Sequence, residues 1–157
     1  MKTRKPWREK MDNPNLPKVE PIRPKMHKRY GTGTMLIPSP RDVEAFIRSV
    51  AEGEIVTISK MRQDLAGKYS ADVTCPLTTG IFVRIAAEAA EEDARDGKPV
   101  ITPYWRVVKD DGSLNPKFPG GAARQAARLR AEGHRILPAR GAKPPKVAGI
   151  ETHSRMA

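Results

Sequence analysis

The chain has 157 residues, 38% of them hydrophobic, and a net charge of +11. This length suits one domain with a single modest core. No stretch approaches the roughly 18 consecutive apolar residues of a membrane span, and the first ten residues are charged where a secretion signal would be apolar, so we expect a cytoplasmic protein without a membrane partner. A single cysteine and three scattered histidines exclude an internal disulfide and zinc-site spacing, so we expect no metal and no cofactor.

The positive charge is concentrated at the two ends of the chain. Residues 1–30 carry 10 Lys/Arg against 3 Asp/Glu, residues 31–133 carry 14 against 14, and residues 134–157 carry 5 against 1. Basic segments bind the phosphates of nucleic acids by releasing counterions, although such segments also simply keep proteins soluble. The distribution favours a nucleic-acid partner over solubility alone.

Proline content and charge divide the chain into three segments. We expect residues 1–34 to be a basic flexible arm, because five prolines among the charges oppose helix and strand. Trp7 in this arm is expected to dock on the domain, with stacking on a base as the alternative. Residues 35–137 form the predicted domain, and residues 138–157, which contain several prolines and glycines, form an irregular basic tail.

The first predicted helix follows Ser39, which can serve as its N-cap with Pro40 in the first position. Apolar residues from Val43 to Val50 then recur at the spacing of one helical face. We expect this helix to end near Gly53.

Two further helices are expected to form a helix-turn-helix. One follows Thr57 and stops within residues 67–70. The other begins after Cys75, where Pro76 suits the first turn, and its alanine-rich run is expected to reach Asp93. The candidate DNA-contacting residues on this pair of helices are Lys60, Arg62, Thr78, Thr79 and Arg84.

The end of the third helix carries an acidic run that is a poor face for DNA. We expect this run to be solvated or to contact a protein partner. Its members are Glu88, Glu91, Glu92 and Asp93.

β-Branched and aromatic residues dominate residues 100–108, which predicts a strand. Asp111-Gly112 supplies a turn that would pair this strand with a short return strand. A final helix is expected to follow Gly120-Gly121 and to run to about Glu132, with Gly133 placed to end it in the left-handed conformation. The predicted fold class is therefore mainly α with a small β-hairpin, arranged as a winged helix-turn-helix.

The segment from Pro103 to His134 resembles the C-terminal domain of the O6-alkylguanine-DNA alkyltransferases. The run Pro103-Tyr104-Trp105-Arg106-Val107-Val108 corresponds to that family's Pro-Cys-His-Arg-Val segment. A turn glycine, a Gly-Gly pair and a Glu-Gly that ends the last helix follow in the same order, with one extra residue before Gly120. Residues 53–57 resemble the entry into the family's helix-turn-helix, so the resemblance covers roughly residues 35–137.

The resemblance implies a DNA-repair fold that lacks the residues of the usual reaction. The family transfers an alkyl group from a flipped-out guanine to a cysteine thiolate, which is activated through a histidine and a glutamate. Tyr104 and Trp105 occupy the cysteine and histidine positions, and only Glu132 of that relay is present. A phenol with a pKa near 10 is a poor nucleophile at neutral pH. The pattern therefore resembles the alkyltransferase-like proteins, which bind alkylated DNA and pass it to excision repair.

The resemblance places a lesion pocket at Tyr104, Trp105, Arg106 and Glu132, with the two rings stacking on an extruded base. The alternative is structural: Arg106 ties down a loop or helix end, and one ring of the two fills the core while the other points outward, as neighbours in a strand do. Two family features are missing. The tyrosine that rotates the phosphate falls near Ile58, and the intercalating arginine has no clear counterpart.

The sequence thus predicts a non-enzymatic protein that binds alkylated duplex DNA, with an excision-repair protein as a possible second partner. One alternative is a generic nucleic-acid-binding or protein-interaction module on the same fold. Another is an enzyme whose nucleophile is Cys75, at a helix N-terminus where the dipole favours a thiolate. The competing interpretation of Cys75 is a half-buried packing residue.

Overall fold

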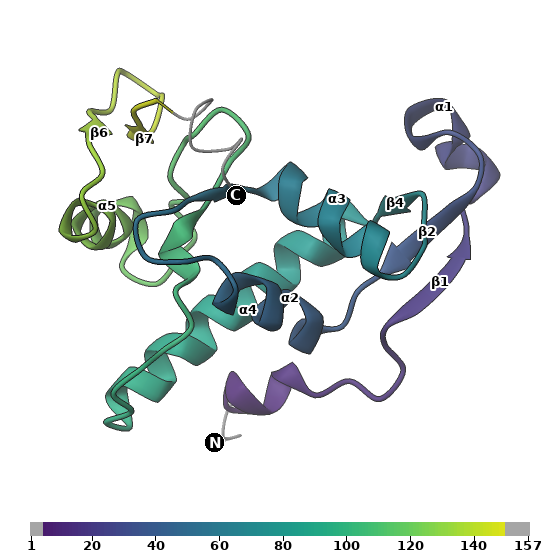
Figure 1. Ribbon diagram of the computed structural model, residues 1–157, viewed down its shortest axis with the longest axis horizontal. Coiled ribbons are helices and arrows are strands. Elements are labelled where there is room, and N and C mark those ends of the chain that lie inside the picture. Colours follow the sequence, from purple (N-terminus) through teal and green to yellow (C-terminus); the bar gives the residue numbers. More distant parts are fainter. Residues whose placement is uncertain (1–4, 150–157) are drawn as a thin grey trace.

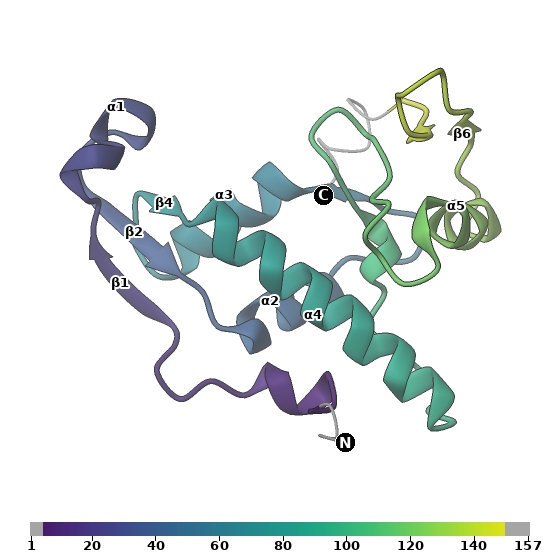
Figure 2. The ribbon, with the colours of Figure 1, turned by 180° about the vertical axis from the view of Figure 1, so that it is seen from behind.

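The computed structural model describes residues 5–149, and the long helix α4 (Pro76–Arg95) runs through the middle of the molecule (Figure 1). α2 (Pro40–Arg48) and the N-terminal segment pack along α4, and α5 (Gly121–Ala131) lies on the other side of the molecule from the sheet that contains β1 (Lys18–Pro21) and β2 (Thr34–Ile37; Figure 2). The core joins residues of α2, α3 (Ile58–Lys68), α4, α5 and the segment 104–108. The described part of the chain is mainly helical with small sheets, as the sequence predicts.

Residues 5–34 differ from the expected flexible arm. Met11 is fully buried and Ile22 is 3% exposed, so the segment contributes side chains to the interior. The expectation that it forms neither helix nor strand is wrong, because these apolar contacts and ion pairs to α4 outweigh the effect of the prolines. Residues 1–4 lie outside the described residues. The elements of the segment are the 3-10 helices Arg8–Met11 and Pro24–Met26, the strand β1 (Lys18–Pro21) and the single-turn helix α1 (His27–Tyr30).

A three-stranded sheet lies beside the start of α4 (Figures 1 and 2). β1 pairs antiparallel with β2 (Thr34–Ile37), and β2 pairs in parallel with β4 (Val73–Thr74). The Leu36 carbonyl accepts a hydrogen bond from the Cys75 N–H (2.9 Å). The sheet therefore fixes the position at which α4 begins.

Side-chain caps start α2 and α3 (Ile58–Lys68) at the residues that the sequence predicts. The Ser39 hydroxyl accepts a hydrogen bond from the Asp42 N–H, and the Asp42 carboxylate accepts one from the Ser39 N–H, which is a capping box. Thr57 accepts a hydrogen bond from a backbone N–H in the first turn of α3 (3.2 Å). α2 ends before the expected Gly53.

Residues 69–75 join α3 to α4 and contain β4. The Thr74 hydroxyl donates to the Arg62 carbonyl of α3 (2.7 Å), which holds this connection against the helix. α4 begins at Pro76 as predicted and continues slightly beyond the expected Asp93. The winged helix-turn-helix arrangement stays a prediction, because the connection contains a paired strand where that motif usually has a turn of three or four residues.

Residues 100–108 do not form the predicted strand. Tyr104–Arg106 is a 3-10 helix, and only β5 (Val107–Val108) is extended, paired in parallel with β3 (Val56–Thr57). Pro103 lacks the N–H that a β-ladder needs. The Tyr104 N–H donates a hydrogen bond to the Thr102 carbonyl (2.8 Å), which turns the chain. The β-branched composition pointed to a strand that these two features interrupt.

The predicted hairpin is built from different segments. Residues 109–112 make a turn, but the return segment 112–114 pairs with β7 (Lys146–Val147) instead of residues 100–108. β7 also pairs antiparallel with β6 (Ile136–Leu137). The expected irregular tail is therefore a hairpin as far as residue 149, because Val147, 1% exposed, anchors it in the core. Residues 150–157 lie outside the described residues.

Left-handed glycines begin and end α5. Gly120 has a φ of 76°, and Gly133 has a φ of 93° after the last turn, as the sequence predicts. None of the helices within residues 5–149 is long and apolar enough to cross a membrane. In the same part of the chain, no group of three or more His, Cys, Asp or Glu residues is arranged to hold a metal ion.

Candidate nucleic-acid interface

Glu132 is the centre of a buried ion-pair network at the end of α5. Its carboxylate accepts hydrogen bonds from the Trp105 indole N–H (3.0 Å) and from two guanidinium nitrogens of Arg106 (2.9 and 2.7 Å). Burial alone would raise the pKa of the Glu132 carboxyl, but these hydrogen bonds and the charge of Arg106 outweigh burial and hold the pKa below its usual value. Arg106 also donates to the Val50 carbonyl beyond α2 (2.7 Å), which is the structural role that the sequence left open.

Tyr104 lies in the core. Its side chain is fully buried, its hydroxyl donates to the Glu91 carboxylate, and its ring packs edge-on against Trp105 and Phe118, with centroids 5.4 and 5.2 Å away. Burial and the Glu91 carboxylate raise the pKa of the Tyr104 phenol above its usual value. The expectation of one outward-pointing ring is wrong, since Trp105 is only 8% exposed and a 3-10 turn does not alternate as a strand does. Tyr104 therefore does not line an open pocket.

The acidic run of α4 holds the N-terminal segment against the helix. The Glu92 carboxylate accepts the backbone N–H groups of Trp7 (2.7 Å) and Arg8 (2.9 Å). The Arg8 guanidinium pairs with Asp93 and with Glu44 of α2 (2.7 Å). The Trp7 side chain packs against the core, as the docking interpretation predicts. The acidic run is neither wholly solvated nor left for a partner, so that part of the sequence interpretation is wrong.

Glu91 joins α4 to α5 from the middle of the same run. Its carboxylate pairs with Arg128 (2.9 Å) and Arg124 (3.5 Å) of α5 and accepts the Tyr104 hydroxyl. The Arg128 guanidinium carbon also lies 4.4 Å from the centroid of the Trp105 ring, within the range of a cation–π contact. The residues around Tyr104 and Trp105 are thus already bonded to one another.

A cavity of about 570 Å³ adjoins this network at the surface. Trp105, Arg106, Arg128 and Glu132 line part of it. A base that hydrogen-bonded to Arg106 or Glu132 would have to displace bonds that these two residues make to each other. Buried ion pairs are costly to break, so this cavity is poorly suited to bind a flipped base.

A smaller cavity of about 220 Å³, which we call the base cavity, lies between the start of α3 and the loop after β5. The Phe118 ring that forms one wall is the ring that packs against Tyr104, so Tyr104 supports the base cavity from behind. The sequence analysis missed this cavity, although the resemblance placed one family residue near Ile58. The lining is mostly apolar and consists of Ile58, Val107, Val108, Lys109, Asn115 and Phe118.

Two polar side chains hold the loop 109–118 in place beside α3. Asp110 accepts the Ser59 N–H (2.9 Å) and the Ser59 hydroxyl at the start of α3. Gln125 of α5 is fully buried, accepts the Asn115 N–H (2.8 Å) and donates to two backbone carbonyls of the segment 105–107. A carboxylate at the first turn of a helix is also favoured by the helix dipole. The wall of the base cavity is therefore fixed from two sides.

The residues expected to contact DNA from α4 do not share one face. Thr79 is fully buried and its hydroxyl donates to the Cys75 carbonyl (2.7 Å), so the prediction that it contacts DNA is wrong. Thr78 is half-buried and donates to Sγ of the half-buried Cys75 (3.2 Å), while Arg84 is exposed. The exposed face of the first turns consists of Leu77, Gly80, Ile81 and Arg84.

The two candidates on α3 are half-buried and already have partners. Lys60 pairs with Asp64 one turn later (3.1 Å), and the Arg62 guanidinium donates to the Ser59 hydroxyl (3.1 Å). An exposed i,i+4 pair is weak and can be exchanged for a phosphate at little cost. Lys60 and Arg62 therefore keep the charge needed for a phosphate contact.

The described residues define a mainly helical protein with small sheets and a base-sized apolar cavity beside the start of a surface helix. No protein-family model and no curated protein matches the sequence. Among solved structures, the crystal structure of S. pombe Atl1 in complex with damaged DNA containing O6-carboxymethylguanine is similar. It is 18% identical, the match covers 71% of this chain and 90% of that chain, and the TM-score is 0.49. At this identity and TM-score, the likeness does not assign a function.

Proposed function

We propose that this chain is a non-enzymatic DNA-binding protein that accommodates an alkylated guanine in the base cavity. The observation that carries the proposal is the position of this cavity. The Phe118 ring lines it and packs against Tyr104, the residue at which the resemblance to the alkyltransferases places the acceptor cysteine. A base flipped out of a duplex would meet the cavity from the α3 side.

The lining of the base cavity suits one base with a small alkyl group. Its volume of about 220 Å³ is below the roughly 300–1,000 Å³ of sites for larger ligands. Ile58, Val107, Val108 and Phe118 provide apolar walls, against which aromatic bases and alkyl groups pack. Lys109 and Asn115 bring polar groups to the same lining.

Alkyl transfer to Tyr104 is disfavoured by its surroundings. The raised pKa of the phenol makes a phenolate rare at neutral pH, and the carboxylate that accepts its hydrogen bond is itself paired with two arginines. Burial also keeps the hydroxyl away from the base cavity. The protein is therefore proposed to bind and signal damage without turnover, with an excision-repair protein as the partner that acts next.

Phosphate and groove contacts are proposed to come from the exposed face of α4, with Arg84 at its end, and from Lys60 and Arg62 of α3. Trp7 and Arg8 are docked on α4, and β1 is paired with β2, so this segment contributes charge from a fixed position rather than as a mobile arm. Such contacts set affinity, while the base cavity sets the preference for damage.

The proposal is tested by competition binding at fixed salt, on matched duplexes with and without one O6-methylguanine, followed by the intact mass of the protein. Tighter binding to the damaged duplex with unchanged mass is the expected result. Equal binding to both duplexes would indicate that the protein is a generic nucleic-acid binder. A gain of one methyl group would indicate an enzyme, and Cys75→Ser would then show whether Cys75 is the acceptor.

The variant Ile58→Trp tests the cavity itself. Ile58 is half-buried at the start of α3 and lines the base cavity, so a larger ring at this position should fill the cavity; chemical denaturation checks that the variant remains folded, since Ile58 also packs against the core. We expect the preference for damaged DNA to disappear while binding to undamaged duplex is retained. Val100→Trp is the matched control, because Val100 is 76% exposed and lies outside the base cavity. An unchanged preference in Ile58→Trp would reject this cavity as the receiving site.

A further inference from the structure

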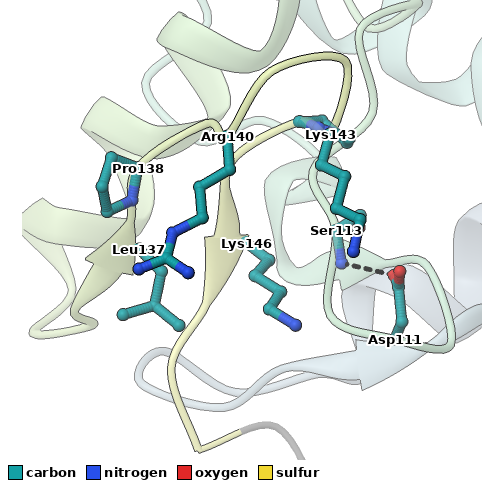
Figure 3. A pocket seen from close by; sticks show the side chains of 8 residues that line it. Asp111, Ser113, Leu137, Pro138, Arg140, Lys143 and Lys146 are labelled. Carbon is teal, nitrogen blue, oxygen red and sulfur yellow. Dashed lines mark hydrogen bonds between the residues drawn. The ribbon is translucent and has the colours of Figure 1, made fainter.

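A third cavity, of about 470 Å³, lies between the C-terminal hairpin and the turn at residues 109–113 (Figure 3). Three cationic side chains line it: Arg140 and Lys143 extend from the tip of the hairpin, and Lys146 extends from β7. We call this cavity the basic cavity. Its three cations lie outside the residues that carry the resemblance and outside the lining of the base cavity.

The hairpin keeps one register over its whole length. Ile136 pairs with Val147 at one end, and Arg140 exchanges two backbone hydrogen bonds with Lys143 (3.1 and 2.9 Å) at the tip. Gly141, with a φ of 56°, allows the tight turn between them. Residues opposite each other in an antiparallel pair lie close together, so the tip places two cations side by side.

The other edge of β7 is fixed to the body of the protein. The Val147 N–H donates to the Gly112 carbonyl (3.0 Å), and the Leu114 N–H donates to the Pro145 carbonyl (2.9 Å). Val147 and Leu114 are both buried in the core. The cations are therefore held by an anchored hairpin, even though their side chains are exposed.

Arg140 and Lys143 have no carboxylate partner within residues 5–149, whereas Lys146 lies near Asp111: the hydrogen bonds from Ser113, followed by the charge of Lys146, hold the pKa of the Asp111 carboxyl below its usual value. Arg140, Lys143 and Lys146 form none of the ion pairs found in that part of the chain. One carboxylate, Asp111, also lines the cavity, and it accepts the Ser113 N–H (2.9 Å; Figure 3). The lining keeps an excess of two positive charges.

The basic cavity lies next to the base cavity along the chain. Lys109 lines the base cavity, while Asp111 and Ser113 of the same turn line the basic cavity. The intervening Asp110 is bonded to Ser59 of α3. The two cavities are therefore lined by residues of the same turn.

We propose that the basic cavity binds phosphate groups of a nucleic-acid backbone. A guanidinium can engage a phosphate with two parallel hydrogen bonds, and each lysine adds a point charge. The inference rests on the proposed function only in taking nucleic acid as the ligand, and it does not require recognition of a damaged base. Because phosphate contacts carry no sequence information, the site strengthens binding to damaged and undamaged DNA equally.

The test compares two double variants of the full chain. Arg140→Ala/Lys143→Ala removes two cations from the hairpin tip, and Arg95→Ala/Arg130→Ala removes two exposed cations from the ends of α4 and α5. Binding constants for an undamaged duplex and for one with O6-methylguanine are measured over a series of salt concentrations. Each phosphate contact contributes about 0.9 to the slope of log K against log salt.

We expect the hairpin variant to reduce the steepness of this negative slope by between about 1 and 2 on both duplexes. The ratio of the two affinities should stay unchanged. A change no larger than that of the Arg95/Arg130 variant would overturn the proposal. Arg140→Lys/Lys143→Arg keeps the charge and should restore the slope. If the protein does not distinguish the two duplexes but the slope still falls, the base cavity proposal fails and the phosphate site stands.

A second measurement distinguishes backbone phosphate from free phosphate. Inorganic phosphate is titrated into the isotopically labelled full chain, and the amide shifts of residues 140–143, Lys146 and Val147 are followed by NMR. We expect small shifts that saturate only at high concentration, and much larger ones at equimolar duplex. Tight saturation by inorganic phosphate alone would mean that the cavity serves a small anion, which also contradicts the proposal.

Discussion

Two groups of cations in this protein differ in whether a carboxylate accompanies them. Around Trp105, Arg106 is bonded to Glu132 and Arg128 to Glu91, each at 2.9 Å or less. At the tip of the C-terminal hairpin, Arg140 and Lys143 have no such partner within the described residues. The first group belongs to the segment that resembles a repair active site, and the second belongs to the segment that looked irregular.

The difference separates charges that hold the fold from charges that can attract a ligand. The folded protein loses much stability when one partner of a buried ion pair is removed, whereas an exposed cation contributes little to stability. An exposed, unpaired cation can instead release counterions from a nucleic acid. Because each ion pair around Trp105 sums to zero, the net charge of +11 comes from cations elsewhere in the chain.

The largest effect is expected from Glu132→Ala. It leaves the Arg106 guanidinium, whose side chain is 13% exposed, without its carboxylate and should lower the free energy of unfolding by about 3–5 kcal/mol. Chemical denaturation measures the loss. Arg124→Ala is the control, since that side chain is 51% exposed and its removal should cost no more than about 1 kcal/mol. A small loss of stability with complete loss of lesion preference would instead make Glu132 a ligand-binding residue.

A smaller effect is expected from Arg8→Ala in the N-terminal segment. The substitution leaves Glu44 and Asp93, which are 8% and 5% exposed, without one of their cations. Unsatisfied buried charges of this kind should cost about 1–3 kcal/mol in thermal or chemical unfolding. Lys18→Ala is the matched control in the same segment, because Lys18 is 54% exposed and its partner Glu20 is 34% exposed. Equal effects in the two variants would mean that residues 5–34 are held more loosely than their contacts indicate.

Local signals in the sequence were sufficient to predict where α2, α3 and α4 begin and where α5 ends. Ser39 and Thr57 begin α2 and α3, Pro76 begins α4, and Gly133 follows α5 in the left-handed conformation. Each of these signals acts within one turn of the helix that it starts or ends. These local signals place the starts of α2, α3 and α4 and the end of α5, whereas α2 ends at Arg48 and α4 at Arg95 rather than at the expected residues.

Three of the errors involve partners distant in sequence, whereas the strand wrongly predicted at residues 100–108 is interrupted locally by Pro103 and the 3-10 turn after it. The N-terminal segment is ordered by Glu92 and Asp93, more than eighty residues away, and composition alone cannot reveal such a pair. The tail is ordered by pairing with residues 112–114. The base cavity, too, is formed by α3 and a loop some fifty residues later, so the resemblance identified its neighbours Tyr104 and Trp105 but not its lining.

Lowering the pH should weaken the ion pairs of Glu132 with Arg106. The Glu132 carboxyl has a lowered pKa in the folded chain, so its contribution to stability is fully present above the usual glutamate pKa of about 4.3 and is lost as the pH falls through the folded value. We expect the wild type to be more stable than Glu132→Gln at neutral pH and this advantage to shrink below about pH 4. Unfolding free energies of both proteins between pH 7 and pH 3 measure it. A constant difference would contradict the role of the Glu132 charge.

The smallest effect on stability is expected from the hairpin variant Arg140→Ala/Lys143→Ala. Both side chains are exposed and unpaired within the described residues, and the hairpin is anchored elsewhere by Val147, so the free energy of unfolding should stay within about 0.5 kcal/mol of wild type. Denaturant unfolding measured beside the Glu132→Ala variant makes the contrast direct. If the hairpin variant lost several kcal/mol, its cations would be part of the fold, and a weakened salt dependence of DNA binding could then reflect unfolding. Unchanged stability together with a lower salt slope assigns the effect to lost phosphate contacts.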